Sequence, residues 1–431
     1  MSTSKLWNKN FTIITVGTVI SMLGNAISGF AIGLLVLDYT QSIFLYSLFM
    51  VAYNLPKIIM PMVAGPYLDN FPRAKVIYTL DFLSAALYLG LFFLLHFNIF
   101  SFWPFLALAV LIGSIDSVYQ TAYDSLYPKL IGKEHYSKAY SISSIIYPLA
   151  AVMVPVAAFA YQKLGNIAPL FLFNAATFLI AAIMEVFIKA PETHVQHRTQ
   201  KFTAKYYFNE FKAGVDYIRS EKGLLVITAY FLIANLSYST GALALPYFKT
   251  TPGLDVMAYT FVMGANLMGR LVGGFLHYKM KLPPKRKFAI ALTVYITTCV
   301  LEGGYLFTPV GVMIALMFLS GLLSVTSFNI RISATQSYIP NDYRGRFNGS
   351  FQMLLSFGMI VGQLVSGALG DYFSARAIIM IGYMTNLAAV FLVMLPGGKH
   401  VKRIYNAVYE TPEKPEGLQE PNLTNPAAQD E

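Results

Sequence analysis

The chain has 431 residues, of which 56% are hydrophobic and 12% charged, and its mean hydropathy of +0.55 lies outside the range of soluble globular proteins. Its net charge of +10 does not indicate nucleic-acid binding, because the basic residues are scattered through short connections between apolar runs. The single cysteine, Cys299, excludes an intrachain disulfide, and no thiolate metal site is indicated. We therefore expect an integral membrane protein with no metal, cofactor or nucleic-acid partner.

Apolar runs of about 20 residues, long enough to cross a bilayer as helices, recur along the chain. Helices are expected because lipid offers no partner for exposed backbone groups, and the runs are too uniformly apolar for barrel strands. The first run continues without a small-residue cleavage site, which predicts a retained span and not a signal peptide. We expect twelve spans, at residues 11–37, 42–64, 76–97, 101–126, 139–161, 167–189, 224–247, 254–278, 288–307, 310–333, 347–369 and 375–395.

Basic residues gather in alternate connections between these spans. Arg73 and Lys75 follow the second span and Lys279 to Lys287 follow the eighth, whereas the connections near Asp38 and Glu302 hold no lysine or arginine. By the positive-inside rule, the basic connections and both termini should face the cytoplasm. The sequence predicts a multi-pass protein of the inner (plasma) membrane.

One long connection divides the chain into two halves. We expect an N-terminal six-helix bundle at 1–189, a cytoplasmic linker with weak helical periodicity at 190–222, a C-terminal six-helix bundle at 223–398 and a disordered acidic tail at 399–431. The halves align at an offset of about 210 residues, which sets Gly65 against Gly274 and Pro128 against Pro340. Such a pair of repeats is typical of transporters.

The connection "GPYLDNFPRAK" resembles a known family signature. It is similar to the loop between the second and third helices of the major facilitator superfamily, roughly G-x-x-x-D-R-x-x-R-R, with Gly65, Asp69, Arg73 and Lys75 at the matching positions and Asn70 where a basic residue is usual. The surrounding sequence resembles the branch of bacterial macrolide-efflux and enterobactin-export type proteins. The resemblance implies an all-α membrane fold of twelve helices in two pseudo-symmetric bundles, with these four residues forming a conformational latch. The alternative is an ordinary basic turn.

The same resemblance implies a function. It predicts a monomeric secondary transporter for proton-coupled efflux of an amphipathic small molecule, drug-like or siderophore-like, by alternating access. Uptake or facilitated movement of a nutrient or lipid-like solute remains an alternative, as does a receptor or scaffold that moves nothing. An enzyme is not expected, because no serine, histidine and acid grouping or metal-binding helix motif occurs.

Several charged residues lie inside the predicted spans. Lys57 and Asp81 fall at comparable depth on adjacent helices, which predicts an ion pair, and Glu185 and Glu302 lie near span ends, which predicts interfacial positions. Asp116 lies about 18 Å from the end of its span, on a polar stripe that suits a water-filled pathway. Asp116 and Lys57 are therefore candidates for proton coupling, or for a static pair.

Polar side chains at mid-membrane depth predict the substrate cavity. Arg270 and Arg331 could neutralise a substrate anion or hold helices together. Glycines at 358, 362, 367 and 370 should let a neighbouring helix approach closely. The expected cavity residues are Asn25, Tyr53, Asn54, Tyr119, Gln120, Asn235, Arg270 and Arg331.

Overall fold

The computed structural model describes residues 6–68, 71–131, 152–189, 204–279 and 282–407, with single residues between 135 and 150. All regular elements within these residues are helices. Ten of the described segments are long and apolar enough to cross a bilayer, judged by length and composition. The expected fold class, an all-α membrane protein with two six-helix bundles, is confirmed.

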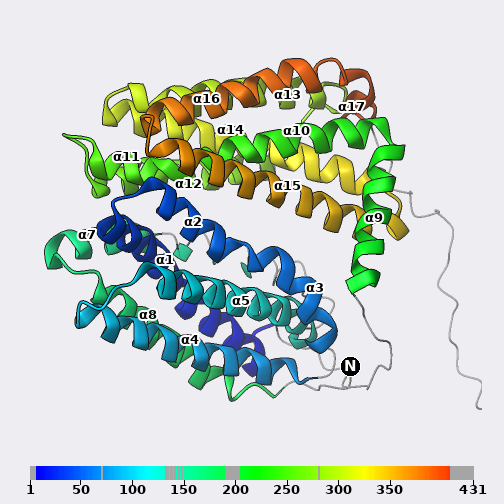
Figure 1. The fold of residues 1–431 in the computed structure, drawn as a ribbon. Coiled ribbons are helices and arrows are strands. Elements are labelled where there is room, and N and C mark those ends of the chain that lie inside the picture. Colours follow the sequence, from blue (N-terminus) through cyan, green and yellow to red (C-terminus); the bar gives the residue numbers. More distant parts are fainter. Residues whose placement is uncertain are drawn as a thin grey trace, which may run out of the picture.

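The first bundle contains the N-terminal half of the chain (Figure 1). Its second span is broken at Leu55, because Pro56 has no N–H to continue the helical hydrogen bonds. In the fifth expected span, 139–161, the structure describes single helical positions up to residue 150 and a continuous helix from Met153. The helices are α1 (Lys9–Thr40), α2 (Ile43–Asn54), α3 (Pro56–Leu68), α4 (Arg73–His96), α5 (Phe102–Leu126), α7 (Met153–Leu164) and α8 (Ala168–Glu185).

The second bundle lies beside the first (Figure 1). Its first span consists of α10, a 3-10 turn at Ser239–Leu243 and α11. The helices are α10 (Lys222–Tyr238), α11 (Ala244–Thr250), α12 (Val256–Lys279), α13 (Lys287–Gly304), α14 (Val310–Tyr338), α15 (Asn341–Gly370), α16 (Ala375–Ala389) and α17 (Gly398–Tyr405).

Two short helices flank the second bundle at one end. In the expected linker, α9 (Ala204–Ser220) lies across the end of the bundles and packs on α15, where Glu210 and Arg346 form an ion pair at 2.8 Å. The expected tail begins inside α17, whose Val401, Ile404 and Tyr405 are buried. The apolar face of this helix explains why it packs on the bundle. Residues 408–431 lie outside the described part of the chain.

The two bundles meet tightly at the end where α1 ends and α2 begins, which we call the closed end. There Asp371, after α15, accepts hydrogen bonds from the Ile43 backbone N–H at 2.8 Å and the Ser42 hydroxyl at 3.0 Å. Lys249 pairs with Asp38, and the Gln162 amide donates to Asp255 at 3.3 Å. All hydrogen bonds and ion pairs that join described residues of the two bundles lie at this end.

Close packing of α15 on α2 completes the closed end. A Cβ atom at Gly367 would lie 2.3 Å from the Ser47 Cβ, and one at Gly370 would lie 2.5 Å from an Ile43 methyl group. Nothing larger than glycine fits at either position without displacing α2. The close approach that was expected from the glycine spacing on this helix is therefore confirmed.

Candidate functional site

A cavity of about 1340 Å³ lies between the bundles. One wall comes from α1 to α5 with contributions from α7 and α8, and the other comes mainly from α12 with single residues of α11 and α14. The volume exceeds that of most small-molecule pockets, which measure about 300–1,000 Å³. The space is therefore large enough for a drug-sized solute and several waters.

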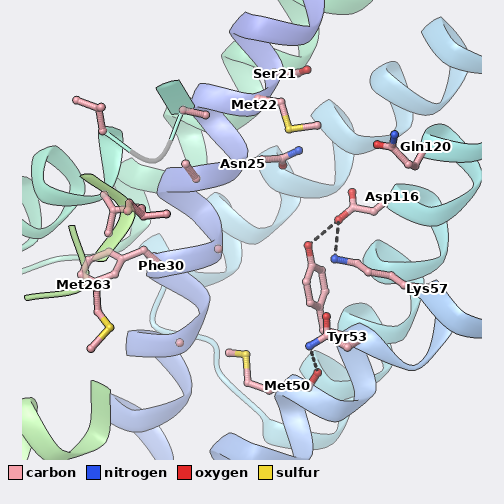
Figure 2. A pocket seen from close by; sticks show the side chains of 18 of the residues that line it. Ser21, Met22, Asn25, Phe30, Met50, Tyr53, Lys57, Asp116, Gln120 and Met263 are labelled. Carbon is pink, nitrogen blue, oxygen red and sulfur yellow. Dashed lines mark hydrogen bonds and ion pairs between the residues drawn. The ribbon is translucent and has the colours of Figure 1, made fainter. Parts of the chain in front are cut away.

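Asp116 is the centre of the first wall (Figure 2). The Tyr53 hydroxyl donates to Asp116 Oδ2 at 2.6 Å, and Lys57 Nζ lies 3.9 Å from the same oxygen. The Lys57 ammonium also lies 3.8 Å from the centre of the Tyr53 ring. The three side chains form one unit in which a carboxylate is held by a hydroxyl and a cation.

Local sequence explains how this unit is assembled. A Cβ atom at Gly113 would lie 2.1 Å from the Tyr53 carbonyl oxygen, so glycine lets α5 approach α2 at that level. Asp116 follows Gly113 by one helical turn and therefore lies beside Tyr53. The Asp116 side chain keeps 20% of its surface exposed and the Lys57 side chain keeps 38%, so both can be reached from the cavity.

The rest of the first wall is also polar. The Asn54 amide donates to the Met50 carbonyl at 2.9 Å, and the Gln120 amide donates to Asp124 at 2.9 Å. Asn25 and Tyr119 line the same wall. Among the described lining residues, Asp81, Asp116 and Asp124 are acidic and Lys57 is basic, so this wall has an excess of carboxyl groups.

The second wall is apolar apart from a few hydroxyl groups. It presents aromatic, methionine and aliphatic side chains, and its hydroxyl groups belong to Tyr259 and Thr260. This wall is not predictable from the sequence, because an apolar side chain that lines a cavity has the same hydropathy as one that faces lipid. The apolar lining residues are Leu245, Phe261, Met263, Ala265, Leu267, Met268, Leu271 and Ile314.

Three cavity residues expected from the second half lie elsewhere. The Asn235 amide donates to the Phe231 carbonyl of its own helix at 2.8 Å, and Arg270 is exposed and donates to Asn266 at 3.1 Å. The Arg331 guanidinium carbon lies 4.8 Å from the Phe231 ring centre and 5.3 Å from that of Phe351. The prediction that these residues line the cavity is wrong, because polarity alone does not fix the direction in which a helix face points.

The expected Lys57–Asp81 pair is also wrong. Lys57 contacts Asp116 instead, and Asp81 lies beside Glu185, with 1% and 0% of their surfaces exposed, respectively. Glu185 is therefore buried in the bundle and not interfacial as expected. No sequence pattern indicates this contact, because 104 residues separate Asp81 from Glu185 and each looks like an isolated charge in its own span.

The predicted latch is described only in part. Arg73 donates to the Ser125 carbonyl at 3.3 Å and Lys75 is exposed. Gly65 lies within α3, and Asp69 lies outside the described residues. The latch therefore stays a prediction.

Comparisons with known proteins agree with this architecture. Residues 14–363 match the family model of the Major Facilitator Superfamily. The chain is 27% identical over 290 residues to an uncharacterized MFS-type transporter, YkuC of Bacillus subtilis (strain 168), covering 64% of this chain and 66% of YkuC, just under two thirds of that relative's length.

Two solved structures share the fold. The nucleoside transporter NupG superposes with a TM-score of 0.67 at 13% identity, covering 89% of this chain and 98% of NupG. A bacterial homologue of the iron transporter ferroportin, in an inward-facing state, gives a TM-score of 0.62 at 16% identity, covering 91% of this chain and 98% of that chain. At these identities the likeness establishes the fold alone.

Proposed function

The chain belongs to the Major Facilitator Superfamily, and we propose that it is a secondary transporter that exports an amphipathic organic cation by alternating access, coupled to proton entry. The observation that carries the proposal is the cavity with one acidic, polar wall and one apolar wall. A solute with a cationic group and a large apolar body satisfies both walls at once. The carboxyl groups attract the charge, and burial of the apolar body contributes about 25 cal/mol per Å².

The charge of the cavity narrows the substrate class. A siderophore-like anion would need cationic partners, and the arginines expected to supply them, Arg270 and Arg331, do not line the cavity. Lys57, the basic side chain among the described lining residues, is already engaged by Asp116. This supports a drug-like cation over an anion.

The apolar wall also argues against a strongly polar cargo. NupG is a nucleoside transporter, and a nucleoside carries hydrogen-bonding groups around most of its outline. Against the wall formed by Met263, Leu267 and Met268, such groups would lose water without gaining partners, at a cost of about 1–3 kcal/mol each. Uptake of a less polar solute remains the second candidate, and the direction of gradient-driven movement distinguishes it from export.

The closed end supports alternating access. Polar contacts between the bundles gather there, at one end of the cavity. The basic connections expected to face the cytoplasm, including Arg73 and Lys75, lie at the other end. In this orientation the structure is sealed toward the outside and the cavity is loaded from the cytoplasm.

The Asp116 unit supports proton coupling. An ionised Asp116 is held by Lys57 and the Tyr53 hydroxyl, and it offers a negative charge to a cationic solute in the cavity. When a proton binds Asp116, that charge disappears and both the solute and Lys57 lose their partner. Cation and proton then compete for one carboxylate, which is the requirement for exchange.

Two ions of the same shape and opposite charge test the proposal. Tetraphenylphosphonium and tetraphenylborate have nearly equal apolar surfaces, so a difference in binding reports charge preference. We expect tetraphenylphosphonium, and not tetraphenylborate or uridine, to raise the unfolding temperature of the purified protein. Inside-out vesicles containing the protein should accumulate tetraphenylphosphonium when acidified inside, with the membrane potential clamped. Equal stabilisation by the two ions, or accumulation equal to that of vesicles lacking the protein, would contradict it.

A further inference from the structure

A second acidic site lies behind the polar wall, in the core of the first bundle. The carboxyl groups of Asp81 on α4 and Glu185 at the end of α8 are within hydrogen-bonding reach of each other. The Tyr119 hydroxyl donates to Glu185 Oε1 at 3.4 Å. Asp81 is 1% exposed and Glu185 is 0% exposed. Two carboxyl groups that touch at such burial cannot both carry a charge.

The surroundings contain no compensating cation among the described residues. The charged side chains that act on Asp81 are Glu185 and Asp116, and both are acidic. From α5 the pair also faces Tyr119, and Tyr123 follows it one turn later. From α1 it faces Gly17, where a Cβ atom would lie 3.1 Å from Glu185 Oε1.

Two basic residues of the helices around the pair are engaged elsewhere, and Lys189, four residues after Glu185, is exposed. Arg73, on the same helix as Asp81, lies about 12 Å away along the helix axis and donates to the Ser125 carbonyl. Lys57 on α3 pairs with Asp116. Neither side chain can neutralise the buried pair.

Unsatisfied atoms give independent support. Neither Asp81 oxygen, nor Glu185 Oε2, receives a hydrogen bond from a nitrogen or hydroxyl of the described residues. An ionised carboxylate normally accepts several hydrogen bonds, and leaving it without donors in a buried site costs several kcal/mol. The Asp81 and Glu185 oxygens that face each other therefore require a hydrogen between them.

Glu302 in the second bundle is a carboxylate with hydrogen-bond donors for both of its oxygens. It lies on α13 and accepts hydrogen bonds from the Ser320 and Tyr383 hydroxyl groups. Both of its oxygens have donors, so no shared proton is needed there. Asp81 differs from Glu302, because neither of its oxygens has such a donor among the described residues.

We propose that Asp81 and Glu185 share one proton and form a proton-binding site distinct from Asp116. The proton lies between the facing oxygens of the two carboxyl groups, while the Tyr119 hydroxyl continues to donate to Glu185 Oε1. Asp81 and Tyr119 also line the cavity, so the proton exchanges with water of the cavity through them. A second coupled proton during transport would follow, and this consequence alone rests on the proposed function.

Infrared spectroscopy tests the site without any substrate. The full-length protein in lipid nanodiscs should show, at neutral pH, the C=O stretch of a protonated carboxylic acid that shifts in D₂O. Selective ¹³C labelling of aspartate and of glutamate should each move this band in the unmutated protein, because the proton is shared. No such band at neutral pH, or a band moved by neither label, would overturn the proposal.

Substitutions assign the infrared band to particular residues. The double variant Asp81→Asn and Glu185→Gln replaces the shared proton by amide hydrogen bonds and should remove the band, while each single variant should change its frequency or its titration midpoint. The matched control Glu302→Gln should leave it unchanged. A band that survives the double variant would place the proton elsewhere. A band that disappears when sodium chloride replaces choline chloride at fixed pH would instead assign the pair to a metal cation.

Discussion

The two bundles share a fold but contribute different surfaces to the cavity between them. The first bundle supplies carboxyl, amide and hydroxyl groups centred on Asp116, and the second supplies methionine, aromatic and aliphatic side chains, mainly from α12. The repeat relation therefore conserves helix arrangement without conserving surface chemistry. Under the proposed function, charge recognition and proton exchange would be concentrated in the first bundle, and the second would provide an apolar face against which a solute can slide and reorient.

This division has a physical advantage for a carrier. A solute held by directional polar contacts on both sides would resist the relative movement of the bundles, because every contact would have to break during the change of access. Apolar contact is non-directional, so it survives a shift of the second wall past the solute. The four predictions below test the division, beginning with the largest expected effect.

The first prediction concerns the centre of the polar wall. Asp116→Asn should abolish pH-driven accumulation of tetraphenylphosphonium in inside-out vesicles, because the amide cannot exchange a proton at that position. The protein should remain folded, since asparagine can still accept from the Tyr53 hydroxyl. Asp216→Asn, an exposed site on α9, is the matched control and should transport normally. Normal accumulation by the Asp116 variant would remove this residue from the coupling role.

The second prediction concerns the contact that joins the bundles. Asp371→Asn removes the negative charge at the start of α2 and weakens its hydrogen bonds, a loss of about 1–2 kcal/mol that should shift the equilibrium away from the sealed state about 5–30-fold. An impermeant maleimide added from the closed end should then label Met50→Cys faster in a Cys299→Ala background. Arg346→Gln, which breaks an ion pair at the other end, should not accelerate labelling. Unchanged labelling in the Asp371 variant would show that other contacts hold this end.

The third prediction concerns the apolar wall. Met263→Ala removes apolar surface from the cavity and should weaken tetraphenylphosphonium binding by about 1–2 kcal/mol, or about 5–30-fold. Thermal stabilisation across a range of probe concentrations measures the affinity. Met380→Ala, on an exposed face of α16 away from the cavity, should leave the affinity unchanged. Similar losses in both variants would mean that the effect comes from protein stability and not from the wall.

The fourth prediction expects almost no effect on binding. Arg331 is enclosed by phenylalanine rings outside the cavity lining, so Arg331→Met should change tetraphenylphosphonium affinity by no more than about twofold while filling similar space. Equilibrium binding to variant and wild-type protein in nanodiscs is the measurement. A loss of about tenfold or more would return Arg331 to the substrate site and break the distinction between the walls.

The fold was more predictable than the site, and the reason is physical. Lipid forces each span to be long, apolar and helical, so hydropathy alone places the helices. The polar candidates of the first half, such as Asn25, Tyr53 and Gln120, do line the cavity, because a membrane helix rarely turns several polar groups toward lipid. Asn235 shows the limit, since it is equally polar and yet is not among the lining residues.

Two features had no signal in the sequence. Met263 and Met268 line the cavity, yet apolar residues look alike whether they face a solute, a neighbouring helix or lipid. The contact between Asp81 and Glu185 depends on how α4 and α8 pack, which no local spacing reveals. The sequence predicted one ion pair between Lys57 and Asp81, whereas the structure pairs Lys57 with Asp116 and places Asp81 beside Glu185.

The break at Leu55 gives the Asp116 unit an unusual mechanical setting. Tyr53 precedes the break and Lys57 follows it, so the two partners of one carboxylate belong to two different helical segments, α2 and α3. A swing of α3 about this joint would lengthen the Lys57–Asp116 distance while the tyrosine stays in place. The strength of this ion pair would then depend on the tilt of α3. Proton binding to Asp116 would therefore change as the molecule opens.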